Sequence, residues 1–309
     1  MTRVACVGEC MVELSEHPDG TLTRSFGGDT LNTSLYLARL GVPVDYVTAL
    51  GDDPFSSEML ERWAAEGIGI GLIPRVPGAL PGLYLIRTDA RGERRFYYWR
   101  ESAPVRALFR RPEIDALTDA LCRAALIYLS GITLSLFDEA SRNLLFDTLA
   151  RARAAGAQVA FDTNFRPRGW PDFAVARAVY ERAFRTADVV LASVEDHMLL
   201  FGSPDPDAVL KRLQMAAVPE AVVKLLSPAC HVVWAGQNDV VVAEPVQDVL
   251  DTTAAGDSFA AGYLAARRAG SAPAAAGAIG HQLAGAVVRH RGAIIPKAAM
   301  PTLALGPAA

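Results

Sequence analysis

Short apolar runs alternate with segments of helical periodicity along most of the chain. The run Val4 to Val7 ends at Gly8 and predicts a buried strand, whereas Ser34 to Leu40 has apolar residues at helical spacing and predicts a helix that stops at Gly41. The same reasoning predicts strands at 44–50, 126–130, 159–162, 188–192, 221–224 and 231–234, and helices at 54–66 and 138–155. Strands that alternate with helices favour a largely parallel sheet with helices on both faces.

One region breaks this alternation. Residues 82–88 and 95–100 are strand-like runs joined by five residues, which is typical of a hairpin. Residues 22–26 are predicted to join it in a small sheet that projects from the main sheet as a flap over a substrate. Because no linker or internal repeat divides the chain, we expect residues 1–309 to form one domain, with a lid built from about 12–26 and 82–101.

Composition narrows the functional classes. The chain has 309 residues, of which 51% are hydrophobic, so it can bury a large core; its formal net charge of -4 does not favour binding to nucleic acid or an anionic membrane. A small polar substrate fits better. Residues 269–288 lack charged side chains but are rich in Ala and Gly, and we expect a buried helix there.

The cysteines carry information about the cellular compartment. None of the four is in a Cys-x-x-Cys pair, so we expect buried thiols; they are Cys6, Cys10, Cys122 and Cys230. Together with the absence of a signal-peptide pattern, this predicts a reducing cytoplasm.

The run Asp251 to Gly262 suggests phosphoryl transfer. It places Asp257 beside a glycine at the expected start of a small-residue helix, where the amides of Ala254, Ala255, Gly256 and Asp257 favour a phosphate. Asp257 is then in position to take a proton from an attacking hydroxyl. Gly256 has no Cβ, so the in-line path between the hydroxyl and the phosphorus stays open.

Two motifs in this order, Gly27 to Asn32 and Asp251 to Asp257, resemble the paired signatures of the PfkB, or ribokinase-like, carbohydrate kinases. Within that family, further stretches resemble the kinases of 2-keto-3-deoxygluconate: 8–14, 26–33, 81–84, 92–100, 162–167 and 292–296. The resemblance covers nearly the whole chain. It implies an α/β fold, a three-layer αβα sandwich with a mostly parallel central sheet and a small projecting β-sheet lid.

The resemblance also implies an activity: ATP-dependent phosphorylation of 2-keto-3-deoxygluconate at its terminal hydroxyl, to give the 6-phospho compound. Asp257 matches the catalytic base of the family, and Ala254, Ala255 and Gly256 match its anion hole. ATP is the implied co-substrate and Mg²⁺ the implied metal ion. A requirement for a monovalent cation stays open.

The substrate residues implied by the resemblance are Gly28, Asp29, Asn32, Tyr84, Tyr98, Arg100 and Arg166. A sugar acid needs fixed cations for its carboxylate, and Arg100 and Arg166 supply them. The alternative is that Tyr98 and its neighbours are ordinary strand aromatics. Glu13 stands where many relatives carry an Asp that holds sugar hydroxyls, but we expect a structural role for it.

The implied nucleotide residues are Asn164, Arg166, Lys224, Ser227 and Gly256. Two of these residues have an alternative structural role. Asn164 is also typical of a turn at the end of a strand, and the Lys224 side chain could instead extend into solvent.

The chain departs from the family pattern in the nucleotide loop. Leu226 replaces a glycine of the relatives, and Pro228 removes a backbone donor. If the turn needs a positive φ, Leu226 costs about 1 kcal/mol or more and narrows the pocket. Asp196 replaces the Glu of the Asn-x-x-Glu motif of the family. A contact between Asp196 and magnesium through a water molecule therefore stays open, and no direct metal ligand is assigned. The spacing of the histidines does not match a zinc site.

Two other functions remain open from the sequence. The first is a kinase for fructose, ribose or a nucleoside. The second is a catalytically impaired sugar-acid binding protein, which Leu226 and Pro228 would explain. Exposed edges of the flap favour pairing with a second copy, so we expect a homo-oligomer, at least a dimer.

Overall fold

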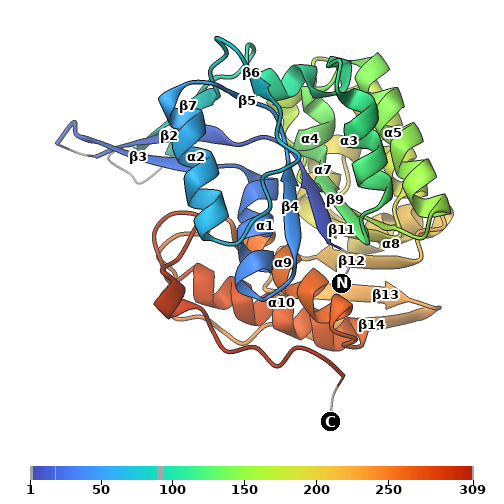
Figure 1. Ribbon diagram of the computed structural model, residues 1–309. Coiled ribbons are helices and arrows are strands. Elements are labelled where there is room, and N and C mark those ends of the chain that lie inside the picture. Colours follow the sequence, from blue (N-terminus) through green and yellow to red (C-terminus); the bar gives the residue numbers. More distant parts are fainter. Residues whose placement is uncertain (1–2, 18, 89–93, 308–309) are drawn as a thin grey trace.

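A long central sheet with helices on both faces organises the molecule (Figure 1). The computed structural model describes residues 3–17, 19–88 and 94–307. The strand order of the central sheet is β14-β13-β12-β11-β10-β9-β1-β4. The strands are β1 (Val4–Val7), β4 (Val44–Val47), β9 (Leu126–Ser130), β10 (Gln158–Asp162), β11 (Val189–Ser193), β12 (Glu220–Lys224), β13 (Ala229–Trp234) and β14 (Gln237–Val242). The neighbours from β12 to β4 are parallel, and β13 and β14 are antiparallel.

The burial of the strands explains the apolar runs in the sequence. All residues of β1 and β9 are buried, because helices cover both faces of a parallel sheet. One helix layer contains α1 (Asp29–Arg39), α2 (Pro54–Ala65), α9 (Ala255–Arg268) and α10 (Pro273–Val287). The other contains α3 (Ile114–Cys122), α4 (Gly131–Leu136), α5 (Glu139–Ala154), α6 (Phe173–Thr186), α7 (Val194–Phe201) and α8 (Pro206–Met215). The predicted α/β fold with three layers is confirmed.

Small residues bring α9 close to α10. A Cβ placed on Gly262 of α9 would lie 3.1 Å from the Cα of Gly280 in α10, so a larger residue would push the helices apart. This contact explains the Ala- and Gly-rich segment 269–288, which the structure confirms as a packed helix. No helix in the described ranges is both long and apolar enough to span a membrane.

A second, four-stranded sheet projects from the main body (Figure 1). Its order is β3 (Leu22–Gly27), β2 (Met11–Glu16), β7 (Gly82–Thr88) and β8 (Arg94–Trp99). The predicted hairpin is therefore present as β7 and β8, while its connecting residues 89–93 lie outside the described residues. The register places Ser25, Glu13, Tyr84 and Tyr98 in one row across the four strands. That row defines the polar face of the small sheet.

Some predicted boundaries differ from the structure. The strand predicted at 44–50 ends at Val47, and β5 (Leu50–Gly51) pairs separately with β6 (Arg75–Val76). The first helix begins at Asp29 and so includes part of the Gly27 to Asn32 motif. Short 3-10 turns complete the elements: η1 (Pro104–Arg110), η2 (Pro167–Gly169) and η3 (Lys297–Ala299). The four cysteines are free thiols, but Cys122 is half-buried where a buried thiol was predicted.

Candidate active site

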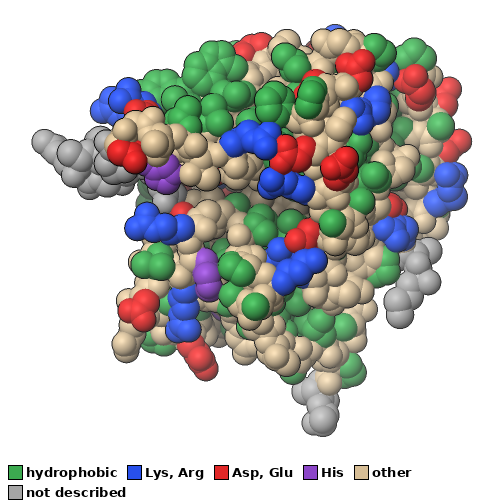
Figure 2. All heavy atoms as spheres, turned by 60° about the vertical axis from the view of Figure 1, so that its left-hand side comes forward, with side chains coloured by type: hydrophobic (Ala, Val, Ile, Leu, Met, Phe, Trp, Pro, Cys, Tyr) green, Lys and Arg blue, Asp and Glu red, His purple; other side chains and the backbone are tan. Residues whose placement is uncertain are grey.

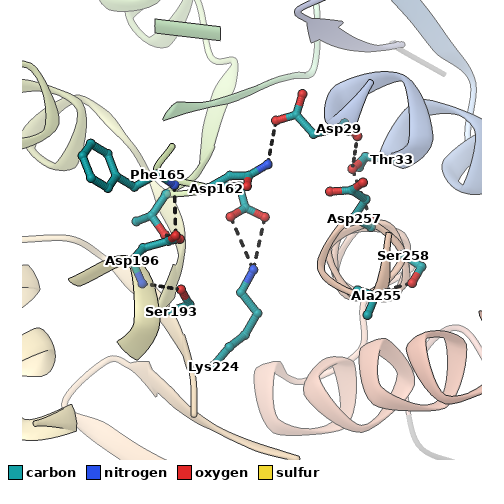
Figure 3. A network of polar contacts seen from close by, with 12 residues as sticks. Asp29, Thr33, Asp162, Phe165, Ser193, Asp196, Lys224, Ala255, Asp257 and Ser258 are labelled. Carbon is teal, nitrogen blue, oxygen red and sulfur yellow. Dashed lines mark hydrogen bonds and ion pairs between the residues drawn. The ribbon is translucent and has the colours of Figure 1, made fainter. Parts of the chain in front are cut away.

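Charged side chains meet where the parallel strands end (Figure 3). Asp162 is the last residue of β10 and Lys224 the last of β12, and the Lys224 Nζ lies 3.3 Å from both carboxylate oxygens of Asp162. Burial raises the pKa of Asp162, and the Lys224 ammonium opposes that shift. The alternative in which Lys224 escapes to solvent is therefore wrong.

Asp257 lies in the first turn of α9 and is held by α1. The Asn32 Nδ2 donates to the Asp257 Oδ2 at 2.8 Å, and the Thr33 hydroxyl donates to the Asp257 carbonyl at 3.2 Å. Burial raises the pKa of Asp257, and the negative charge of Asp29 raises it further. A carboxylate with a raised pKa is a stronger base near neutral pH, which suits removal of a proton from a hydroxyl.

The N-terminus of α9 differs in detail from the predicted anion hole. Ala254 is the N-cap residue, with φ 60° and ψ 15°, a left-handed conformation that costs a residue with a Cβ roughly 1 kcal/mol. The Ala255 amide already donates to the Thr252 carbonyl at 3.2 Å, because the chain turns tightly before the helix. A Cβ on Gly256 would lie 3.7 Å from the Lys224 Nζ, so the helix terminus and the lysine are neighbours.

Asp29 and Asn164 form a bridge between α1 and the loop after β10. The Asn164 Nδ2 donates to the Asp29 Oδ2 at 2.8 Å, and Asn164 has a positive φ of 26°. The turn role expected as an alternative for Asn164 is thus present. Gly28 has a packing reason of its own: a Cβ there would lie 2.1 Å from the Glu9 carbonyl oxygen.

The polar face of the small sheet carries the predicted tyrosines. The Tyr84 hydroxyl donates to the Glu13 carboxylate, which also accepts from the Ser25 hydroxyl at 2.8 Å. The rings of Tyr84 and Tyr98 lie 5.8 Å apart between centroids. Glu13 is buried, and its contacts show the structural role expected for it, because it fixes the orientation of Tyr84.

The two predicted arginines approach the same tyrosine from different segments. The Arg100 guanidinium lies 5.8 Å from the Tyr98 ring centroid, and Arg166 follows the loop after β10 with 59% of its side chain exposed. Burial raises the pKa of Tyr98, while the positive charges of Arg100, Arg166 and Arg168 all oppose the shift. Three guanidinium groups thus act on Tyr98 against the negative charge of Glu9, and this excess of positive charge suits an anionic ligand.

Residues 1–300 match the family described as pfkB family carbohydrate kinase. The chain belongs to the pfkB family. It is 45% identical, over 96% of its length and 98% of the relative, to a 2-dehydro-3-deoxygluconokinase of Dickeya dadantii. Its fold is similar to a fructokinase with bound ATP from Xylella fastidiosa, with a TM-score of 0.78, 28% identity, and coverage of 97% and 95%. A putative ribokinase II from E. coli in complex with ATP and Mg²⁺ gives a TM-score of 0.82 at 22% identity, with coverage of 95% and 94%. This chain is thus a carbohydrate kinase of an ATP-using family with the ribokinase-like fold.

The nucleotide loop of this pfkB kinase is less unusual than its sequence indicates. Leu226 is 70% exposed, and the non-glycine residues with positive φ in the described ranges are Asn164, Ala217, Ala235 and Ala254. The cost predicted for Leu226 is therefore absent. The turn is closed by the Leu225 amide, which donates to the Ala229 carbonyl at 2.9 Å, and Ser227 is exposed within it.

Asp196 of the kinase shapes the loop that follows β10. Its carboxylate accepts from the Thr163 hydroxyl at 2.6 Å and from the Phe165 amide at 3.0 Å (Figure 3). Within the described ranges, no three His, Cys, Asp or Glu residues are grouped to hold a metal ion. The residues present fit a Mg²⁺ ion that keeps most of its water ligands and is otherwise coordinated by phosphate oxygens.

One residue of this site escaped the sequence reasoning. Glu9 directly follows the glycine after β1, and its Oε2 lies 2.5 Å from the Arg100 Nη2. The position of Glu9 in the sequence could have identified it. A carboxylate just after the first parallel strand lies at the same edge of the sheet as Asp162.

Proposed function

We propose that this kinase transfers the γ-phosphoryl group of ATP to the terminal hydroxyl of 2-keto-3-deoxygluconate. The observation that carries the proposal is the arrangement of Asp257 at the N-terminus of α9, held by Asn32 and close to Lys224. This arrangement suits removal of a proton from a hydroxyl next to a bound phosphate. The name of the Dickeya dadantii relative supports the choice of substrate.

In this proposal the residues near α9 act on the transferring phosphoryl group. Asp257 takes the proton as the substrate oxygen bonds to the γ-phosphorus and the bond to the bridging oxygen breaks, which releases ADP. The α9 terminus, with Ala254, Ala255 and Gly256, stabilises charge on the transferring group. Lys224 adds a positive charge on the phosphate side, and Asn164, Arg166 and Ser227 remain proposed nucleotide contacts.

Mg²⁺ would neutralise charge on the phosphate oxygens when bound. Asp196 is the nearest proposed contact through water, although its oxygens already accept from Thr163 and Phe165.

The small sheet would recognise the sugar acid. Arg100 and Arg166 would bind the carboxylate, and the hydroxyls of Tyr84 and Tyr98 would contact the sugar chain beside Gly28, Asp29 and Asn32. A neutral sugar would offer these two guanidinium groups no carboxylate, and they would keep their contacts with Glu9 and Asp196. The charges around Tyr98 therefore favour a sugar acid.

A kinase for fructose, ribose or a nucleoside is the competing function, and the Xylella fastidiosa fructokinase shares the fold. The impaired binding protein is less favoured, because Leu226 is exposed and has no positive φ.

ADP release with MgATP separates these functions, with 2-keto-3-deoxygluconate, fructose, ribose, a nucleoside and no sugar compared side by side. Turnover on the keto-deoxy acid that Asp257→Asn abolishes supports the proposal. Turnover on a neutral sugar alone would assign the competing function, and sugar-acid binding without turnover would assign a binding protein.

Assembly and location complete the proposal. The face of the small sheet opposite Tyr84 holds a shallow apolar hollow of about 480 Å³, and Trp99 and Leu22 are exposed there at 58% and 53%. An exposed apolar face of this kind would be buried in the proposed homodimer. Figure 2 shows basic and acidic side chains interspersed over much of the face that it draws, with hydrophobic side chains gathered along the upper edge. Free thiols fit a reducing cytoplasm.

A further inference from the structure

Glu9 and Arg100 form a buried ion pair that links the two sheets. Glu9 lies in the loop after β1 and is 2% exposed, whereas Arg100 directly follows β8 and its side chain is 20% exposed. The Glu9 Oε2 and Arg100 Nη2 are 2.5 Å apart. A Cβ on Gly82 of β7 would lie 3.2 Å from both the Arg100 Cβ and the Glu9 Oε1, so the backbone of the small sheet packs against the pair.

The pair is poorly satisfied. Both carboxylate oxygens of Glu9, and the Nε and Nη2 of Arg100, are buried and have no aligned hydrogen-bond partner among the described residues. The attraction between the two charges therefore has to offset most of the cost of taking them out of water. Arg100 is therefore available to a better partner that reaches the site.

Other charged and titratable groups surround Glu9 on several elements. They are Arg100 and Tyr98 from the β8 segment, Arg106 from η1, Asp29 from α1, Tyr46 from β4 and Cys10 from its own loop. Burial raises the pKa of Glu9 to about 7; Arg100 and Arg106 oppose this shift, and Asp29 adds to it. A small change in local charge is thus enough to change its protonation near neutral pH.

We propose that Glu9 is the positioning residue for Arg100, and that the substrate carboxylate takes Arg100 from Glu9, which accepts a proton from solvent as the acid binds. The inference rests on the proposed function, because it takes Arg100 as the partner of a sugar-acid carboxylate. The physical reason is repulsion: a second carboxylate at Arg100 disfavours the ionised form of Glu9. Between the pKa of Glu9 in the free protein and its raised pKa in the complex, up to one proton is bound for each sugar acid bound, so the affinity for the acid falls by up to tenfold per pH unit in that range.

Calorimetry measures this proton directly. The enthalpy of 2-keto-3-deoxygluconate binding at pH 7.5 is compared in buffers of different ionisation enthalpy, for wild type, Glu9→Gln and Glu16→Gln. Glu16 is the matched control, because it is paired with Arg87 on the same sheet away from Arg100. We expect proton uptake in wild type and Glu16→Gln, and its loss in Glu9→Gln. Equal uptake in all three proteins would overturn the inference.

A measurement on wild type keeps the test independent of whether Glu9→Gln folds. The ¹³C chemical shift of the Glu9 carboxyl carbon is titrated with and without the sugar acid. We expect the acid to raise the pKa of Glu9 by about one unit or more. An unchanged or lowered pKa in the complex contradicts the proposal.

Failure of the proposed function looks different. If wild type binds no keto-deoxy acid, the substrate assignment falls, but the role of Glu9 is still measured by thermal unfolding between pH 5 and 8. The folded-state pKa of Glu9 is raised, so its protonated form stabilises the fold at low pH, and this stabilisation is lost as pH rises towards about 7. Wild type should therefore lose stability relative to Glu9→Gln over this range, and parallel pH profiles would overturn the raised pKa of Glu9 that the inference needs.

Discussion

The two halves of the site are built in different ways. The transfer half, Asp257 with Asn32 and the residues before α9, consists of one sequence motif at a helix terminus that a neighbouring helix clamps. The recognition half, Tyr84, Tyr98 and Arg100 with their carboxylate partners, is assembled from separate strands and a loop. In the proposed mechanism the chemistry would therefore depend on local backbone geometry, while the choice of sugar would depend on long-range pairs that can change independently.

The largest expected effect is on the transfer half. Asp257→Asn keeps the shape of the side chain and the contact to Asn32 but removes the base, so kcat should fall by roughly 10²–10⁴-fold. The sugar-acid dissociation constant should stay within about threefold. Steady-state ADP release and calorimetry measure the two values. A variant that keeps most of its kcat would exclude Asp257 as the base.

A smaller effect is expected from the recognition half. Tyr84→Phe removes the hydroxyl that donates to Glu13 and that is proposed to contact the sugar chain, and one hydrogen bond contributes about 0.5–1.5 kcal/mol. We expect KM for the sugar acid to rise by up to about tenfold, with kcat changed less than KM. Tyr97→Phe is the matched control, since Tyr97 is exposed on the same sheet. A selective loss of kcat in Tyr84→Phe would remove the distinction between the halves.

The buried carboxylate of Asp257 should also reduce the stability of the fold at high pH. The folded-state pKa of Asp257 is raised, so its protonated form stabilises the fold at low pH, and that contribution is lost as pH rises through the raised pKa. Asp257→Asn should therefore unfold a few degrees above wild type at pH 8, with the gap closing towards pH 4. Thermal unfolding against pH measures it, and a less stable variant at pH 8 would contradict this reasoning.

The smallest effect concerns the backbone before α9. Ala254 has a left-handed conformation, so Ala254→Gly relieves strain and should stabilise the fold by up to about 1 kcal/mol, as judged by urea unfolding. Ala235→Gly is the matched control at a turn, since Ala235 also has a positive φ of 47°. We expect kcat within about twofold of wild type in both. A large loss in Ala254→Gly alone would mean that the strain itself supports catalysis.

Much of this architecture could be predicted from sequence because its signals are local. The apolar runs gave β1, β9 and β10 within a residue, and the Asp251 to Asp257 motif marked the start of α9. The conformation of the 225–228 turn could not be predicted, because φ at Leu226 depends on how β13 returns against β12. Glu9 was missed since its partner, Arg100, is 91 positions away in the chain and only the folded small sheet brings them together.

The central claim is that the recognition half binds the carboxylate of the substrate, while the transfer half performs the chemistry. It is tested most directly by kcat/KM for 2-keto-3-deoxygluconate and for fructose in wild type, Arg100→Gln and the exposed control Arg95→Gln. We predict that Arg100→Gln loses about 10–100-fold for the acid, as expected for a charge-assisted hydrogen bond, while the value for fructose and both values in Arg95→Gln stay close to wild type. Equal losses for the two sugars, or an unchanged value for the acid, would contradict the account.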